Sequence, residues 1–406
     1  MPERLVLSGP RLADGRTVDV RLRHGRIEAV GTPGSLSASG SAAGSASGSA
    51  ADGHVDLSGH LLLPAPAEPH AHHDTALTGD ATAPPEQDPH PLHRRITEAA
   101  LIQLGHGATA QRTHVRVDGA GGLTALDAAL GTRRALRGLV DLTTVAVPRV
   151  LTGRAGADNR ARLREAAEMG AHVLGGCPDL DPDPAGHLDT VLGLADAFGR
   201  PVDLHTEGED PARLARLASA AAACRSAVTI GPCTGLSRLP GPLAARAAER
   251  LAAAGVAVVC VPQGACAHTA RPAGAAATPV ALLTAAGVPV AAGGGALRDA
   301  ANPVGRGDPL EAAFLLAARR ECGADDAYGA VSRRARAALG LPEVRIEAGF
   351  PAELLAVRGD SVAGVLSQGY TRLVIHRGRI VARTSAVREF CGAPAGGLEL
   401  PRQATG

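Results

Sequence analysis

The sequence is poor in aromatic residues. Its 406 residues include no Trp, two Tyr and four Phe, which leaves few flat side chains on which nucleobases could stack. The 41 basic and 40 acidic side chains give a net charge of +1, so no broad positive field favours nucleic acid or an anionic membrane. Small molecules are therefore the expected ligands.

Long apolar runs and cysteine pairs are also lacking. No run of 18 apolar residues is present, and the N-terminus has neither the basic nor the apolar region of a signal peptide, which predicts a cytoplasmic protein. The seven cysteines are scattered without a C-x-x-C pair and are expected to be reduced core residues. Cys233 is interpreted as a buried thiol, because no recognisable base accompanies it.

Apolar runs alternate along most of the chain with helical stretches rich in Ala, Leu and Arg, an order typical of parallel βα units. Eight such units over residues 60–342 predict an α/β fold, a (β/α)8 TIM barrel, whose site lies at the carboxyl ends of its strands. The strand candidates are residues 60–72, 107–117, 139–149, 172–180, 201–207, 226–233, 256–264 and 289–295.

Both ends of the chain carry a strand-turn-strand pattern. Residues 1–31 alternate apolar and polar positions around a turn at His24-Gly25, and residues 352–383 repeat the pattern. We predict one small discontinuous β-sandwich, formed by residues 1–59 and 343–390 and followed by a tail at 391–406. Residues 35–53 consist largely of Ser, Gly and Ala and are expected to form a flexible surface loop.

Histidines end two of the predicted barrel strands. His70 and His72 close the first candidate and are two residues apart, so on an extended chain they point to the same side. His205 lies near the end of the fifth candidate and would face the same cavity. Three imidazoles suffice for a catalytic zinc site. An H-x-H pair also occurs by chance, and surface or turn histidines remain the alternative from spacing alone.

Other features favour structural interpretations. His73 follows His72 directly and should point away from the pair. His114 lies inside a strand and is expected mainly to pack or hydrogen-bond in the barrel interior. His268 is expected to be a solvated loop residue. The glycine run 293–295 has no following Lys-Ser or Lys-Thr, so it predicts tight backbone at a strand end and not a phosphate site.

The motifs taken together resemble the cytosine deaminases and related amidohydrolases over nearly the whole chain. The resemblance begins with EPHAHHDTALTGD at the first strand end. It continues, in the order and spacing of that family, through RTHVRVD (112–118), LVDLTTVAVP (139–148), GGCPDLDPD (175–183), PVDLHTEGED (201–210), NPVGRGDPLEAAF (302–314) and TRLVIHRGRIVAR (371–383).

The resemblance implies one zinc or iron ion that activates water for attack on a ring such as cytosine. His70, His72 and His205 fall on its three histidine ligands. The family's fourth ligand, an aspartate closing strand eight, falls on Gly295, and its histidine at the end of strand six falls on Pro232. Neither residue can perform the family's task.

Three further positions also depart from the family. The proton-shuttle glutamate falls on Gly208, although the neighbouring Glu207 shares the strand face of His205 and is the better substitute. A substrate-gripping glutamine falls on Arg149, which would suit an anionic ligand, and a ring-stacking aromatic falls on Ala301. Asp299 belongs to an Arg-Asp pair of the family and is interpreted as structural.

Two functions remain open. The first is a divergent amidohydrolase of cytosine deaminase type, with ancestral metal-dependent hydrolysis of carbon–nitrogen bonds in cyclic amidines or amides and with weak or absent deamination. General acid and base groups contribute about 100 to 10,000-fold each, so losing two is severe. The second is a catalytically silent barrel that binds a small molecule or regulates a partner. A homo-oligomer is an open alternative by analogy with related barrels.

Overall fold

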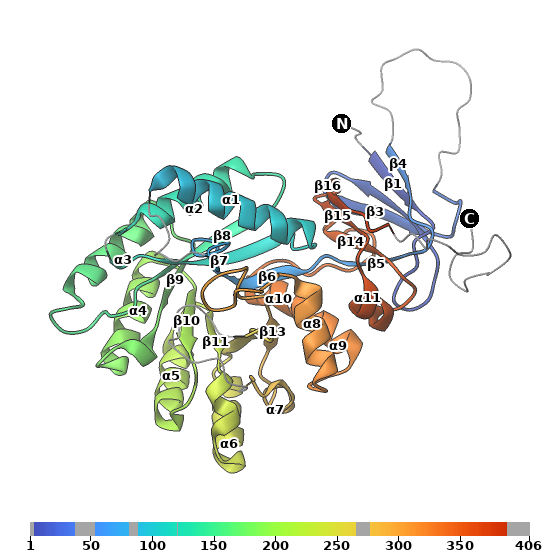
Figure 1. The fold of residues 1–406 in the computed structure, drawn as a ribbon. Helices are drawn as coiled ribbons and strands as arrows, with labels where there is room; N and C mark the ends of the chain where they lie inside the picture. The colour runs from blue at the N-terminus through green and yellow to red at the C-terminus, as the bar shows by residue number, and fades with distance from the viewer. Residues whose placement is uncertain (1–3, 37–52, 81–87, 120, 265–276, 388–406) are drawn as a thin grey trace. The chain divides into compact units, whose positions relative to one another are not determined.

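The computed structural model describes residues 4–36, 53–80, 88–119, 121–264 and 277–387 (Figure 1). The chain forms two compact units, one made of Met1–Leu63 with Ile346–Gly406 and the other of Pro64–Arg345. Most of the predicted loop at 35–53, the tail at 391–406 and His268 lie outside the described residues.

Eight parallel strands form the sheet of the larger unit, and they follow one another in chain order. An isolated parallel bridge between Ala71 and Gly295 joins the first strand end to the segment after the last, so the sheet is a nearly closed barrel. The predicted barrel is confirmed. Its strands are β6 (Ala67–Ala71), β7 (Ala110–Arg116), β8 (Asp141–Val147), β9 (Val173–Gly176), β10 (Val202–Thr206), β11 (Val228–Pro232), β12 (Ala257–Cys260) and β13 (Val290–Ala292).

The first strand candidate was too long. Residues 60–72 contain two strands, β5 (His60–Pro64) and β6, and β5 belongs to a sheet of the terminal unit and not to the barrel. Pro64 and Pro66 explain the interruption, because proline has no backbone N–H to donate to a neighbouring strand. The other seven candidates each overlap one barrel strand.

Helices follow most strands of the barrel and cover its outer face (Figure 1). Four of these helices begin with Asp-Pro, and the proline supplies a helical φ. In three of them the aspartate also accepts a hydrogen bond from a backbone amide of the first turn: Asp183 caps α4, Asp210 caps α5 and Asp308 caps α8. The helices are α1 (Pro89–Gly105), α2 (Thr124–Ala135), α3 (Ala157–Met169), α4 (Pro184–Phe198), α5 (Pro211–Ala223), α6 (Gly241–Ala253), α7 (Val280–Ala285), α8 (Pro309–Ala318), α9 (Ala324–Val331) and α10 (Arg333–Ala338), with 3-10 turns η1 (Pro178–Leu180) and η2 (Thr234–Arg238).

Small residues fill the amino-terminal end of the barrel. Ala67 and Ala110 are the first residues of β6 and β7. They pack with Val259 of β12, Ala291 of β13 and Ala335 of α10. Helix α10 therefore covers this end, and Arg112 of β7 reaches the carbonyl of Ala338 in this helix.

The terminal unit contains two four-stranded sheets, as predicted for a discontinuous β-sandwich. One has the order β3-β2-β1-β4 and the other β16-β15-β14-β5. The hairpin at His24-Gly25 is present between β2 and β3. The elements are β1 (Arg4–Ser8), β2 (Asp19–Arg23), β3 (Arg26–Gly31), β4 (Gly53–Asp56), β14 (Leu354–Arg358), α11 (Val362–Gln368), β15 (Arg372–His376) and β16 (Arg379–Thr384). Among the described residues of both units, no helix is long and apolar enough to cross a membrane.

Candidate metal centre

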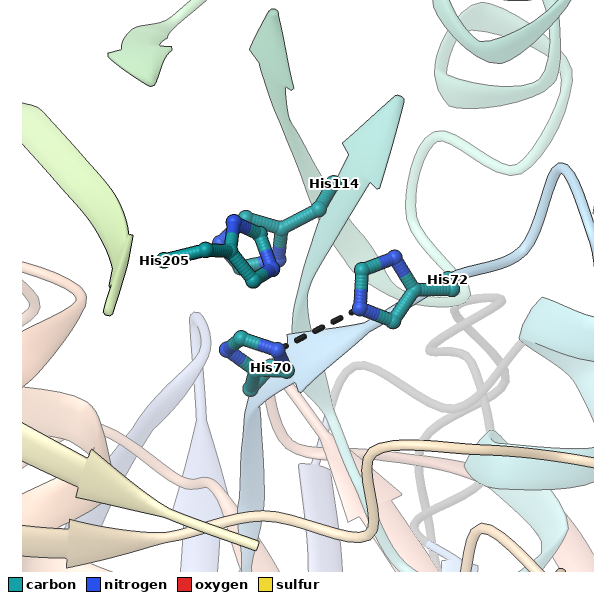
Figure 2. Close-up of side chains that lie close together, drawn as sticks. All are labelled: His70, His72, His114 and His205. Atoms are coloured by element: carbon teal, nitrogen blue, oxygen red, sulfur yellow. Dashed lines mark hydrogen bonds between the residues drawn. The ribbon is translucent and has the colours of Figure 1, made fainter. Parts of the chain in front are cut away.

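Four buried histidines meet inside the barrel (Figure 2). They are His70 and His72 at the end of β6, His114 of β7 and His205 of β10, and the nitrogen atoms that they offer lie within 4.8 Å of one another. The Nε2 atoms of His70 and His72 are 3.3 Å apart. The structure thus brings together the three predicted ligands and adds a fourth imidazole.

His114 also lies in this cluster, although the sequence led us to expect it mainly to pack or hydrogen-bond in the barrel interior. Its ring centroid lies 4.2 Å from that of His70 and 4.7 Å from that of His205. Parallel pairing of β6 with β7 sets Ala71 beside Thr113, which carries His114 to the level of the H-x-H pair. A signal was present in RTHVRV, because Arg112 and His114 share one face of a strand that is buried on both faces.

Burial keeps His70 in the protonation state that metal binding requires. Removal from water, followed by the neighbouring His114, lowers the pKa of His70 to about 3, so its imidazole is neutral near pH 7. A neutral imidazole is the form that binds a metal ion. Both ring nitrogens of His114 are buried and have no hydrogen-bond partner among the described residues.

The donor set fits a metal ion. Four imidazole nitrogens in a buried site match the ligand preference of zinc, and imidazole also suits iron. The four-histidine cluster, defined as His70, His72, His114 and His205, can therefore hold one metal ion.

Gly295 and Pro232 stand where the resemblance to the deaminases implies a metal-binding aspartate and a histidine. Neither residue has an ionisable side chain. Gly295 has φ +67°, and a Cβ atom added there would lie 3.2 Å from Cγ1 of Val261. Pro232 follows a cis peptide bond at the end of β11, and its carbonyl accepts a 2.6 Å hydrogen bond from Thr278 Oγ1. Gly208, at the predicted shuttle position, also has a positive φ of +69°.

Glu207 lies just beyond β10 and outside the four-histidine cluster. Its backbone amide donates a 2.8 Å hydrogen bond to Asp179 Oδ2, and its carboxylate accepts one from Thr234 Oγ1. The proposed base is thus held by loops that follow β9 and β11. Its catalytic role stays a prediction.

The two predicted recognition positions flank other strand ends. Arg149 is half-buried two residues after β8 and lies near Cys177, whose pKa burial raises to about 12 while the arginine opposes the rise. The Ala301 amide donates a 2.9 Å hydrogen bond to Asp299 Oδ1. These contacts do not show what either residue binds. Substrate binding by Arg149 stays a prediction.

Several structural interpretations are confirmed. His73 lies outside the cluster, with Nε2 2.9 Å from Gln103 Oε1. Asp299 accepts hydrogen bonds from the amides of Ala301 and Asn302 and thus shapes its own loop. Burial raises the pKa of Cys233 well above its usual value, so the thiol is inert.

Comparisons with known proteins agree with this geometry. The sequence profile of the amidohydrolase family matches residues 97–382. Pterin deaminase of Rhizobium rhizogenes (strain K84) is 32% identical over 245 residues, which are 56% of this chain and 54% of that protein. The match therefore spans about half the length of this relative.

Solved structures resemble the chain along nearly its whole length. N-isopropylammelide isopropylaminohydrolase from Burkholderia multivorans superposes with a TM-score of 0.81 at 28% identity, covering 95% of this chain and 99% of that one. The 5-methylcytosine deaminase from Klebsiella pneumoniae gives 0.78 at 23% identity, covering 95% and 98%, a likeness of fold alone. The chain belongs to the amidohydrolase family.

Proposed function

We propose that this amidohydrolase is a metal-dependent hydrolase of carbon–nitrogen bonds in cyclic amidines or amides, with weak or absent deamination of the cytosine type. The observation that carries the proposal is the four-histidine cluster, which is buried at the carboxyl ends of barrel strands. Pterin deaminase and N-isopropylammelide isopropylaminohydrolase are named for the removal of an amino or alkylamino group. The same bond type is the proposed point of attack here.

Different residues would bind the metal ion, transfer the proton and bind the substrate. His70, His72, His114 and His205 would hold one metal ion, which would lower the pKa of water and so supply a nucleophile at neutral pH. Glu207 carries the proton between nucleophile and leaving group, with its loop held by Asp179 and Thr234. Arg149 binds an anionic group of the substrate.

Weak deamination follows from what is lacking at Pro232 and Gly295. A missing general acid or base costs about 100 to 10,000-fold in rate, and the proline has no side-chain nitrogen to replace a histidine. The same two positions support a second candidate, a catalytically silent barrel that binds a small molecule or regulates a partner.

Metal content separates the two candidates. Protein purified without chelators is analysed by mass spectrometry of its metals, beside the double variant His70→Ala, His72→Ala and the control His73→Gln. His73 is buried next to the pair but bonds to Gln103. Near one zinc or iron per chain in wild type and control, and none in the double variant, is the expected result.

A screen of cyclic amidines, amides and ureas follows with the metal-loaded protein. Slow hydrolysis that disappears in the double variant supports the proposal. Metal-free wild-type protein would overturn the hydrolytic proposal and leave the silent barrel. Deamination of cytosine at ordinary enzyme rates would overturn the predicted weakness.

A further inference from the structure

Asp203 is a buried carboxylate inside the barrel, beside the four-histidine cluster. Its Oδ2 atom accepts a 2.7 Å hydrogen bond from Arg112 Nη1, and its Oδ1 atom lies 3.4 Å from His114 Nε2. The side chains of Arg112, His114 and Asp203 are exposed by only 4%, 0% and 1%. Water therefore competes little for these contacts.

The contact crosses the barrel interior. Arg112 and His114 are two residues apart on β7, whereas Asp203 lies on β10, and β8 and β9 separate these strands in the sheet. Asp203 precedes His205 by two residues and so shares its strand face. Arg112 also donates to the Ala338 carbonyl at 3.0 Å, which fixes the guanidinium at the end of α10.

We propose that Asp203, held by Arg112, positions His114 as the fourth ligand of the metal centre. This imidazole from β7 would then replace the strand-eight carboxylate for which the chain has Gly295. The inference rests on the proposed metal site. Histidine ligands usually share their second ring nitrogen with a carboxylate or carbonyl, which fixes the orientation of the ring and raises its basicity.

A purely structural ion pair is the competing explanation. Arg112 and Asp203 tie β10 to α10 through the Ala338 carbonyl, and replacing one member of a buried pair destabilises the fold whether or not a metal binds. Stability alone therefore cannot decide. Metal affinity and the ligand field of a bound ion can distinguish the two explanations, because a purely structural ion pair would leave the affinity and the ligand field unchanged.

The experiment compares wild type, Asp203→Asn, His114→Ala and the control Asp181→Asn. Asp181 suits the control because it is also a buried carboxylate with a histidine partner, His187, whose Nδ1 lies 2.9 Å away, yet neither belongs to the cluster. Zinc affinity is measured by competition with a coloured chelator, and the visible spectrum of bound Co²⁺ reports the ligand field.

We expect zinc binding to weaken about 10 to 100-fold in Asp203→Asn, the usual effect of losing an outer carboxylate partner. His114→Ala should bind at least as weakly and should change the Co²⁺ spectrum, whereas Asp181→Asn should match wild type. If Asp203→Asn does not fold, the affinity and spectrum of His114→Ala decide.

Wild-type affinity and spectrum in both Asp203→Asn and His114→Ala would overturn this inference and leave the metal site intact. Wild-type protein that binds neither zinc nor cobalt would overturn the proposed function and this inference with it.

Discussion

The backbone amide of Gly294 donates a 2.7 Å hydrogen bond to the carboxylate of Glu68, where the first and last barrel strands meet. The other carboxylate oxygen accepts the amide of His70 at 2.9 Å. A Cβ atom added to Gly293 would lie 2.3 Å from Glu68 Oε1, so the glycine run makes room for this carboxylate. One buried side chain therefore helps both to close the barrel and to place a metal ligand.

Replacing Glu68 should weaken the barrel. In Glu68→Ala the amides of His70 and Gly294 lose their buried acceptor, and each unsatisfied group costs about 1–3 kcal/mol, so we expect a loss of about 3 kcal/mol in the free energy of unfolding. Urea denaturation measures it. Glu165→Ala, at an exposed position of α3, is the control and should change stability by less than about 0.5 kcal/mol. Equal stability of the two variants would contradict the prediction.

The fold could be predicted from the sequence because its signals are local. Alternating strand and helix patterns give the order of a parallel barrel, and each terminal hairpin is encoded by a short alternating run. The error at 60–72 arose where two strands of different sheets follow each other directly, divided only by Pro64 and Pro66.

The site could be predicted only in part. The two-residue spacing of His70 and His72 is visible in the sequence. His114 joins them through the pairing of β6 with β7, which no local sequence pattern encodes. The contact between His114 and Asp203 joins residues 89 positions apart across the barrel, and it depends on the closure of the sheet. Such contacts follow from the fold and not from any motif.

Placing an aspartate at Gly295, the position of the deaminase-type ligand, should destabilise the fold. Gly295→Asp would place a side chain at φ +67°, where a left-handed conformation costs about 1–2 kcal/mol, and would crowd Val261. Gly287→Asp is the matched control, since Gly287 has φ +87° but no heavy atom within 4 Å of an added Cβ. Urea denaturation should show a larger loss for Gly295→Asp. A variant as stable as wild type would show that the backbone relaxes freely there.

Metal binding should stabilise the folded protein. An ion that binds the native state alone, at 1,000 times its dissociation constant, contributes about 4 kcal/mol to the free energy of unfolding. Zinc should therefore raise the melting temperature of metal-free wild type, and EDTA should reverse the rise. The double variant His70→Ala, His72→Ala should melt at one temperature with and without zinc. A zinc-dependent rise of equal size in that variant would place the bound ion elsewhere.

His172, which does not belong to the four-histidine cluster, should make the stability of the protein depend on pH. The Nδ1 atom of His172 accepts a 3.3 Å hydrogen bond from the Thr144 amide and therefore carries no proton. Burial, followed by Arg133 and Arg200, lowers the pKa of His172 to about 4, against 6.5 for the unperturbed group. Between these values the unfolded chain binds the proton and the folded chain does not, so the contribution of His172 is present above pH 6.5 and is lost as pH falls through 4. Urea denaturation from pH 7 to pH 4.5 measures this loss. The difference in the free energy of unfolding between wild type and His172→Gln should shrink steadily toward acid pH. The control is His54→Gln, at an exposed position of β4, for which the difference from wild type should stay level. An advantage over His172→Gln that grows toward acid pH would mean that the folded protein holds this imidazole in its charged form.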